Sequence, residues 1–390
     1  MRTIPGISSY LKELDKAIDE YLIKPLLNGH SFSYSERQWF SLPAKLGGLG
    51  LIIPSELSDV SYQNSRFATT ELVKKIVLQN ETIVESVEEE RAEVIQQIQK
   101  NKATRDAEKF TYVKGTLDTH KLKLLEATTE KGASSWLTTM PLRNHDLYLN
   151  KQEFWDAVYM RYGIPLPRLP STCVCKKSFT VEHAMSCQRG GFIHIRHNEL
   201  RDFTAELLSE VCKDVSIEPM LTPLTGERFS YNTANVEDHA RLDVAARGVW
   251  NRGSRAYCDV RVFNPLAPTY QDQTLKAAHK SNENAKKREY GERVRNVEHG
   301  TFTPLVFTCF GGMSVECARF YDKLSEMLSE KRDTPLSIVK SWIRTKISFS
   351  LLRTMNLCIR GSRTKTQHSE DLASTNIIMA VMDTRTENQP

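Results

Sequence analysis

The chain has 390 residues, 40% of them hydrophobic and 26% charged, which allows two or three domains with a substantial core. Its 53 lysines and arginines against 48 aspartates and glutamates leave a net charge of only +5, so nucleic-acid binding would have to depend on local basic patches. No secretory leader or run of about 18 apolar residues occurs, which predicts a soluble intracellular protein without a membrane partner, whose eight cysteines are thiols or metal ligands.

The amino-terminal segment, residues 1–75, contains a glycine-rich turn, Gly47-Gly48-Leu49-Gly50, followed by a helix-compatible run at 55–70. Taken alone, this is the pattern of an ordinary turn between two helices. Residues 76–170 are predicted to form a helical connector, because a charged run there has only a thin apolar stripe: Val84, Val87, Val94, Ile95 and Ile98. A helix that binds a partner is the alternative. Prolines at 165–170 mark a boundary.

Four potential metal ligands are concentrated in residues 171–191. Their spacing is Cys173-x-Cys175 followed by His183-x3-Cys187. Two thiolates on one turn, with a histidine and a cysteine four positions apart on one helix face, suit tetrahedral structural zinc. Chance spacing is the alternative, because the chain has other cysteines, which are expected to be core thiols: Cys212, Cys258, Cys309, Cys317 and Cys358.

Residues 192–350 show helical and strand patterns in an order that predicts an α/β core, with a mixed sheet flanked by helices. The predicted elements are a helix at 197–212, a strand at 215–220, strands at 240–246 and 257–263, a helix-compatible run at 271–297, a buried strand at 302–310 and a helix at 314–328. The expected fold is therefore a mostly helical region, a small zinc-binding segment and this α/β core.

The two strands at 240–246 and 257–263 are predicted to form a hairpin that brings two carboxylates together. Symmetric pairing places Asp243 opposite Asp259, with Cβ atoms ~5 Å apart. Alternation puts both acids on the face that carries Arg261, and Leu242 with the apolar residues of the other face. Two acids this close repel unless a cation lies between them, which predicts a Mg²⁺ or Mn²⁺ site. An acidic pair exposed on the solvent face is the alternative.

This order of elements, with Asp243, Asp259 and a basic residue two positions later, resembles the PD-(D/E)xK restriction-like nuclease fold. The resemblance implies that the two aspartates are the family's metal-binding acids. Leu242 replaces the family's proline, and Arg261 replaces its lysine. A lysine there positions or activates the attacking water, whereas an arginine stays protonated and only stabilises charge, so another residue would supply the lysine.

The endonucleases of non-long-terminal-repeat retrotransposons are similar to this fold but carry the lysine in the following helix, shortly before a tyrosine. Here Lys286 and Lys287 precede Tyr290 by four and three residues, so either lysine could share the face of the tyrosine on a helix. Both remain candidates. Together with Lys276 and Lys280, this run is expected to contact DNA phosphates; a solvated basic face is the alternative.

In these endonucleases a Cys/His cluster and an Arg-His-Asn-like segment precede the nuclease core, and both occur here. The family's zinc motif usually begins C-x2-C, whereas this one begins C-x-C. Arg196 and His197 belong to the second segment and are expected to contact nucleic acid. Glu199 and Glu206, in the first helix of the core, are candidates for an additional acid at the metal site, with exposed helical glutamates as the alternative.

The amino-terminal segment resembles the region after the polymerase palm of retrotransposon reverse transcriptases, through its Gly-Gly-Leu-Gly turn and the spacing Tyr62-x-x-Ser65. No aromatic-x-Asp-Asp segment occurs in the sequence, so the polymerase's catalytic acids are absent. The resemblance therefore implies the carboxyl-terminal portion of such a polyprotein. Residues 351–390 are expected to be basic and then disordered, and the cations at 331–365 either follow DNA phosphates or solubilise the surface.

The function that the resemblance implies is that of a nuclear, Mg²⁺-dependent DNA endonuclease that nicks its target, with element RNA as a further partner. Asp243, Asp259, the backbone carbonyl of residue 260 and Glu206 would hold the metal, while Arg261 stabilises charge on the phosphate and the lysine orients water. The alternatives are a non-catalytic zinc-containing nucleic-acid-binding protein and a truncated, inactive mobile-element remnant. The oligomeric state does not follow from the sequence.

Overall fold

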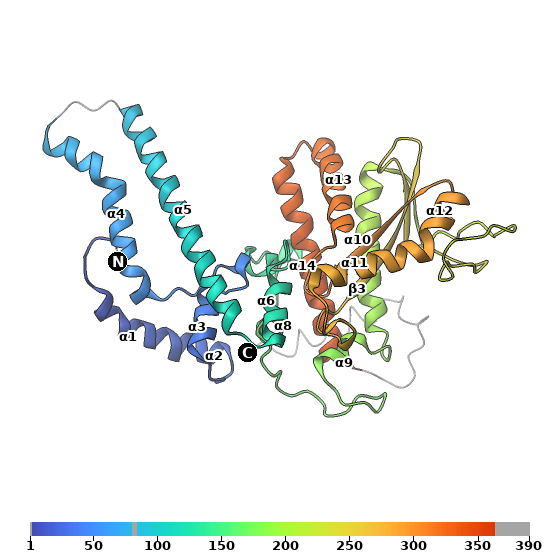
Figure 1. The fold of residues 1–390 in the computed structure, drawn as a ribbon, viewed down its shortest axis with the longest axis horizontal. Helices are drawn as coiled ribbons and strands as arrows, with labels where there is room; N and C mark the ends of the chain where they lie inside the picture. Colours follow the sequence, from blue (N-terminus) through green and yellow to red (C-terminus); the bar gives the residue numbers. More distant parts are fainter. Residues whose placement is uncertain (1, 80–83, 363–390) are drawn as a thin grey trace. The chain divides into compact units, whose positions relative to one another are not determined.

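The computed structural model describes residues 2–79 and 84–362, and the expected disordered tail from 363 onward lies outside this range. The chain divides into two compact units, which interleave in sequence. Unit 1 comprises Met1–Leu125 and Val158–Ile164, and unit 2 comprises Glu126–Ala157 and Pro165–Pro390 (Figure 1). Among the described helices, none has the length and apolar character needed to cross a membrane.

Unit 1 is helical and contains residues from both sides of the predicted boundary at 75. Its elements are α1 (Ser8–Ile18), η1 (Asp19–Ile23), α2 (Lys24–Leu26), α3 (Tyr34–Ser41), η2 (Ala44–Leu46), α4 (Pro54–Val77) and α5 (Val84–Thr116); α6 (Thr119–Thr129) and α8 (Lys151–Tyr162) each contribute one end. Ser33 and Glu36 form a reciprocal cap that begins α3. The following turn requires glycine at position 48, because a Cβ there would lie 1.9 Å from the Leu42 carbonyl oxygen.

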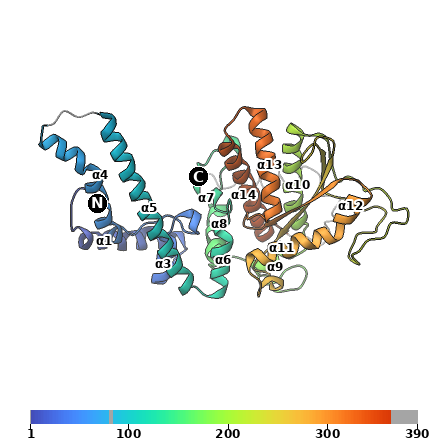
Figure 2. The same ribbon diagram turned by 45° about the horizontal axis from the view of Figure 1, so that its top comes forward.

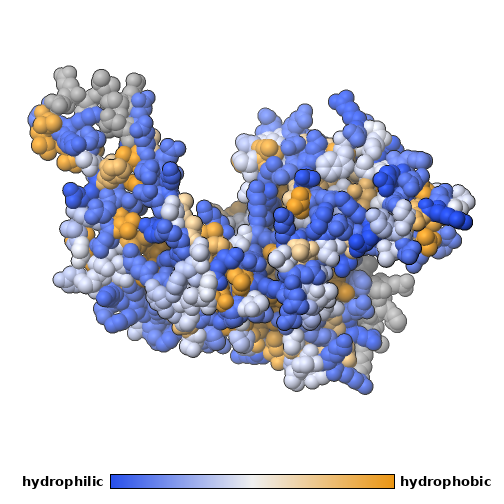
Figure 3. Space-filling model, viewed as in Figure 1, coloured by the Kyte–Doolittle hydropathy of each residue, from blue (hydrophilic) through white to orange (hydrophobic). Residues whose placement is uncertain are grey.

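The helical hairpin of α4 and α5 has apolar side chains that no other part of the described structure buries. Ile95 of the predicted apolar stripe on α5 is exposed, while Val94 and Ile98 are half-buried. Apolar side chains are also exposed over the second half of α4, where Figure 3 shows them gathered: Phe67, Leu72, Val73, Ile76, Val77 and Leu78. Unit 1 therefore leaves an apolar helix surface in contact with solvent.

Unit 2 contains a four-stranded mixed sheet flanked by helices, which confirms the α/β prediction at this level. The strands β1 (Lys213–Ile217), β2 (Val244–Arg247), β3 (Arg255–Phe263) and β4 (Thr301–Thr308) lie in sequence order. Only β3 and β4 are parallel. The other elements are α7 (Ser135–Thr138), η3 (Arg143–His145), α9 (Val181–Ser186), α10 (Phe192–Val211), η4 (Pro268–Tyr270), α11 (Leu275–Lys286), η5 (Lys287–Gly291), α12 (Glu292–Asn296), α13 (Val315–Arg332) and α14 (Leu336–Arg360).

Both faces of the sheet are buried, and different helices cover them (Figure 2). Val260 and Leu305 point into the main core, among apolar residues of α10, α13 and α14 such as Leu324. On the opposite face, Tyr257 packs with Tyr290 and residues of α12. The sheet is therefore the central layer of three, and residues of β3 that alternate between its faces meet either α10 or α11.

The predicted alternation fails at Leu242 and at Asp243. Leu242 packs with Ala245 and Tyr257 instead of sharing the face of Val244, whose side chain lies in the main core. The reason is that β2 begins only at Val244, and the chain bends at Asp243. Because of this bend the Asp243 side chain does not share the face of Asp259 as predicted: it meets His197 of α10, whereas Asp259 meets Lys286 of α11 on the other side of the sheet.

Helix α14 continues across the predicted boundary at 350 and ends at Arg360, with Leu351 and Met355 buried. Its cations do not form an open basic surface, because they bind other parts of unit 2. Arg360 pairs with Asp156 at 2.7 Å. Others donate to backbone carbonyls or pair with an aspartate: Lys346 to His145, Arg353 to Asp146 and Tyr148, and Lys340 and Arg344 to Asp322. The contacts of Lys346, Arg353 and Arg360 attach residues 145–156 of unit 2 to α14.

Leu324→Ala should lower the free energy of unfolding by about 2–5 kcal/mol, because Leu324 is fully buried in the main core and the truncation leaves a cavity. Urea-induced unfolding followed by circular dichroism measures the change. Lys323→Ala on the exposed side of the same helix is the control and should stay within about 0.5 kcal/mol of the parent. Equal destabilisation by both variants would contradict this description of the core.

Candidate functional site

The β2–β3 hairpin brings the two predicted acids together. Val244 pairs with Cys258, which confirms the predicted register for the paired residues of β2 and β3, and Asp243 lies one residue before the first of these pairs. The Asp243 N–H donates to the Cys258 carbonyl at 3.1 Å, and the Val260 N–H donates to Asp243 Oδ2 at 2.5 Å. A backbone donor thus fixes the first carboxylate at the strand that carries the second.

Neither carboxylate lies on an open surface. The side chains of Asp243 and Asp259 are 15% and 8% exposed, so the alternative of a solvated acidic pair is wrong. Burial is the main cause that raises the pKa of Asp259 to about 6; the Lys286 ammonium opposes the rise, and the Asp243 carboxylate adds to it. The two acids therefore interact electrostatically, as the sequence predicted.

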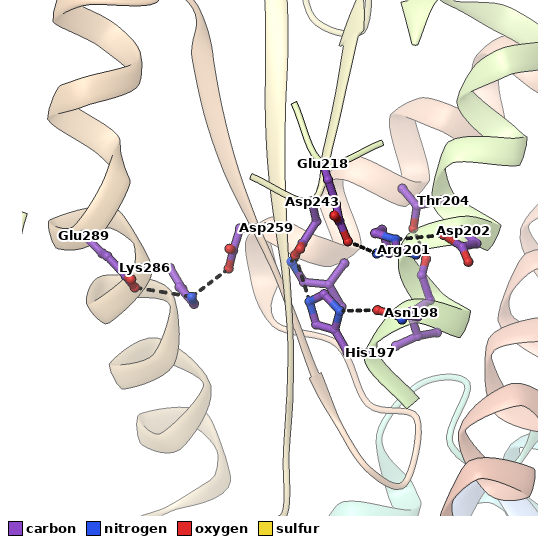
Figure 4. A network of polar contacts seen from close by, with 12 residues as sticks. His197, Asn198, Arg201, Asp202, Thr204, Glu218, Asp243, Asp259, Lys286 and Glu289 are labelled. Atoms are coloured by element: carbon purple, nitrogen blue, oxygen red, sulfur yellow. Dashed lines mark hydrogen bonds and ion pairs between the residues drawn. The ribbon is translucent and has the colours of Figure 1, made fainter. Parts of the chain in front are cut away.

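Asp243 has a partner that the sequence did not predict. His197 Nε2, from α10, lies 3.0 Å from Asp243 Oδ2, and His197 Nδ1 lies 3.3 Å from Asn198 Oδ1 (Figure 4). Burial lowers the pKa of His197, but the Asp243 carboxylate raises it by more. One turn later, Arg201 forms ion pairs with Asp202 and Glu218. A histidine predicted to contact nucleic acid thus binds a site carboxylate.

Asp259 has a different partner, on the opposite side of the hairpin in Figure 4. Lys286 Nζ, at the end of α11, lies 3.1 Å from Asp259 Oδ2, 3.3 Å from Glu289 Oε2 and 5.3 Å from the centre of the Tyr290 ring. Burial lowers the pKa of Lys286, but the Asp259 and Glu289 carboxylates raise it by more, so the ammonium stays charged. Lys287 instead pairs with Glu316. Of the two candidate lysines, Lys286 is the one that contacts an acid of the pair, Asp259.

The predicted additional acids are not at this site. Glu206 follows His197 by nine residues, which is about 180° around an α-helix, so it lies on the far side of α10 and is exposed. Glu199 is also exposed, and the charges that act on it are those of Arg353 and Asp202. The first helix contributes an imidazole to the site in place of a carboxylate.

The residues predicted to contact phosphate or nucleic acid differ in how exposed they are and in what their side chains contact. Arg261 is half-buried on the face of β3 that carries Asp259. Lys276 is exposed, whereas Lys280 pairs with Glu283 at 3.1 Å. Tyr290 is buried, and its hydroxyl lies 3.4 Å from Asn235 Nδ2, which leaves its ring no open face for a base. Of these residues, Lys276 and Lys280 are the more exposed cations.

Arg196 differs from its prediction as a nucleic-acid contact. Arg196 is only 5% exposed, and its guanidinium donates a hydrogen bond to the Met185 carbonyl at 3.2 Å. Met185 lies in α9, between two of the predicted zinc ligands. Arg196 therefore joins the zinc segment to α10, one residue before His197.

The side chains around the hairpin fit a hard divalent cation. Carboxylate oxygens are the ligands that Mg²⁺ and Mn²⁺ prefer. Asp259 Oδ2 is buried and, among the described residues, accepts no hydrogen bond of good geometry, although the Lys286 ammonium is near. The two carboxylates therefore supply oxygen atoms of the kind such an ion binds, and the Lys286 ammonium already pairs with one of them.

The Cys/His cluster has the geometry of a zinc site. The ligand atoms of Cys173, Cys175, His183 and Cys187 all lie within 4.8 Å of one another. The Sγ atoms of Cys173 and Cys187 are 3.8 Å apart, which is about the edge of a tetrahedron with Zn–S bonds of about 2.3 Å. The Lys177 N–H bonds to the Cys175 thiolate and lowers its pKa. The predicted cluster is confirmed, and it could hold a zinc ion.

Cys173→Ser or His183→Ala should reduce bound zinc from about one ion per chain to a trace, because each change removes one ligand from a four-ligand site. Elemental analysis of the purified protein measures the content, and the melting temperature should fall with it. Cys212→Ser, at a half-buried cysteine outside the cluster, is the control and should retain zinc. Equal zinc content in all three variants would contradict the assignment.

In metal-free protein the Asp259 carboxyl should titrate near pH 6, because burial raises its pKa from 3.8 to about 6. Between about pH 4 and 6 the folded chain then holds more protons than the unfolded chain, so the contribution of this group to stability falls as the pH rises. Carbon-13 NMR of the aspartate carboxyl groups, assigned with Asp259→Asn, measures the midpoint. A midpoint at or below the unfolded value would exclude the buried environment described here.

Comparisons with known proteins add no assignment. No protein-family model matches the chain, and a search of curated proteins found no match. The case for a function therefore depends on the geometry of the hairpin, its two flanking helices and the Cys/His cluster.

Proposed function

We propose that the α/β core of unit 2 is a metal-dependent DNA endonuclease of the PD-(D/E)xK-like type, related to the endonucleases of non-long-terminal-repeat retrotransposons. The observation that carries the proposal is that two carboxylates, Asp243 and Asp259, lie at one end of a buried hairpin and that Lys286 pairs with the second of them. The order helix, three strands, helix and strand from α10 to β4 supports it. A lysine delivered by the helix after the second acid is what the resemblance implies.

Each residue near the hairpin has a chemical role in this proposal. Asp243 and Asp259 would hold Mg²⁺ or Mn²⁺, which when bound polarises a phosphate and lowers the pKa of a coordinated water. Lys286 would act as a hydrogen-bond donor that orients the attacking water, because its raised pKa keeps it protonated and unable to accept a proton. Arg261 would stabilise negative charge on the phosphate.

DNA is the proposed partner, held mostly through its phosphates. Exposed cations follow the α11–α12 side of the core, namely Lys276, Arg288 and Arg295. Contacts of this kind give affinity that depends on salt and little on sequence. The Cys/His segment would support the site indirectly, since Arg196 connects it to α10 and α10 carries His197. A protein with this task would act in the nucleus.

A non-catalytic DNA-binding protein is the second candidate, and one observation favours it. Asp243 Oδ2 already accepts hydrogen bonds from the Val260 N–H and contacts His197, which reduces its capacity for a metal ion. Arg261 in place of the family's lysine is consistent with this candidate. Cleavage separates the two functions, because both require DNA binding.

Asp243→Asn, Asp259→Asn and Lys286→Met should each lower Mg²⁺-dependent nicking of supercoiled plasmid by about 100-fold or more, because each removes a metal ligand or the donor to the water. Gel electrophoresis of plasmid with and without chelator measures the rate. Lys323→Met is the control, since Lys323 lies on the exposed side of α13 and pairs with Glu326, and it should stay within about threefold of the parent.

Nicking by the unmodified protein distinguishes the endonuclease from the non-catalytic DNA-binding protein. Chelator-sensitive nicking that disappears in all three site variants would support the endonuclease. DNA binding without nicking by a folded parent would replace it with the non-catalytic function. If Asp259→Asn nicked plasmid as fast as the parent, the activity would come from another site or from a contaminant.

A further inference from the structure

The face of α11 that packs on the core is polar, which is unusual for a buried helix face. The buried residues of this helix are Ala278, His279, Asn282 and Glu283, and only one of them is apolar. Apolar packing has little directionality, whereas hydrogen bonds depend on angle as well as distance. The rotation of α11 about its axis is therefore set mainly by the hydrogen bonds of these polar side chains.

Glu283 makes the most buried of these attachments. It is 1% exposed; its Oε1 accepts the Glu316 N–H at 3.0 Å, and its Oε2 accepts a hydrogen bond from Lys280 at 3.1 Å. Glu316 lies in the first turn of α13, after the N-cap Ser314, where backbone N–H groups lack helical partners. Burial raises the pKa of Glu283, but its hydrogen bonds lower it by more, so the carboxylate is charged at a helix N-terminus.

A second attachment lies one turn earlier. His279 Nε2 is 2.8 Å from Glu130 Oε1, and Glu130 Oε2 accepts a hydrogen bond from Thr308 at 3.2 Å. Gly312 provides the space, because a Cβ at that position would lie 1.6 Å from the Glu130 carboxylate. The beginning of α11 is thereby held at the end of β4.

Lys286 is the next residue on the same face. His279, Glu283 and Lys286 occupy positions i, i+4 and i+7, which lie on one side of an α-helix. Regular α-helix ends at Lys286 and the π-helical turn η5 begins at Lys287, so Lys286 lies in the last turn of α11, which Glu283 attaches to α13. The Glu283 anchor is three residues from the lysine and is the buried attachment of α11 to this turn of α13, beside the more exposed ion pairs that Lys280 and Lys287 form with Glu316.

We propose that Glu283 is a positioning residue: by fastening α11 to the N-terminal turn of α13, it holds the Lys286 ammonium beside Asp259. The kinetic consequence depends on the endonuclease function proposed above. The structural consequence does not, because the position of Lys286 can be measured without any cleavage.

The test compares Glu283→Ala and Glu283→Gln with the parent, after circular dichroism and thermal unfolding have shown that each is folded. Acylation of individual lysines by acetic anhydride, measured by mass spectrometry, reports how accessible Lys286 is relative to the exposed Lys276. Plasmid nicking under saturating Mg²⁺ gives kcat and KM. Ser281→Ala, on the exposed face of α11, is the control.

In Glu283→Ala, Lys286 should be acylated roughly tenfold faster relative to Lys276, and kcat should fall about 10- to 100-fold with KM nearly unchanged, because a displaced catalytic group affects the chemical step more than binding. Glu283→Gln keeps an oxygen acceptor for the Glu316 N–H and should recover most of both properties. Ser281→Ala should match the parent.

Unchanged acylation of Lys286 in a folded Glu283→Ala variant would overturn the proposal, whether or not the parent nicks DNA. Increased acylation together with an inactive parent would support the positioning role while removing the endonuclease function. Increased acylation with unchanged kcat would overturn the catalytic consequence, since Lys286 would then move without affecting the reaction.

Discussion

Two carboxylates at the end of one hairpin repel each other, and the arrangement of unit 2 around Asp243 and Asp259 follows from how that repulsion is offset. Each acid has its own partner from a different layer: His197 of α10 on one side of the sheet and Lys286 of α11 on the other. The Val260 N–H adds a backbone donor to Asp243. Both flanking helices are therefore connected to the sheet at the same place.

Parts distant in sequence support these two partners. Arg196 joins α10 to the Cys/His segment immediately before His197, and Glu283 joins α11 to α13 shortly before Lys286. Buried charged groups of this kind are costly unless fully paired, so they contribute more to the specific placement of the site than to stability. Loss of zinc or of one buried acid is thus expected to disturb the site while leaving much of the apolar core intact.

The sequence was sufficient for the features that depend on local pattern. The hairpin register followed from alternation around a short loop, and the zinc ligands followed from spacing. It was insufficient where side chains meet across layers: His197 and Asp243 are 46 positions apart, and whether His197 faces the sheet depends on how α10 packs. For the same reason Arg196 was expected at the surface, and Lys286 could not be separated from Lys287.

Metal binding at the hairpin is the most direct test. Titration of the folded protein with Mn²⁺, followed by electron paramagnetic resonance of the free ion, counts sites without requiring DNA or cleavage. One Mn²⁺ per chain that is lost in both Asp243→Asn and Asp259→Asn, and retained in Glu206→Gln, is the expected result, since only the first two carboxylates lie at the hairpin. Mn²⁺ binding unaffected by either aspartate substitution would contradict the assignment of this buried pair as a metal site.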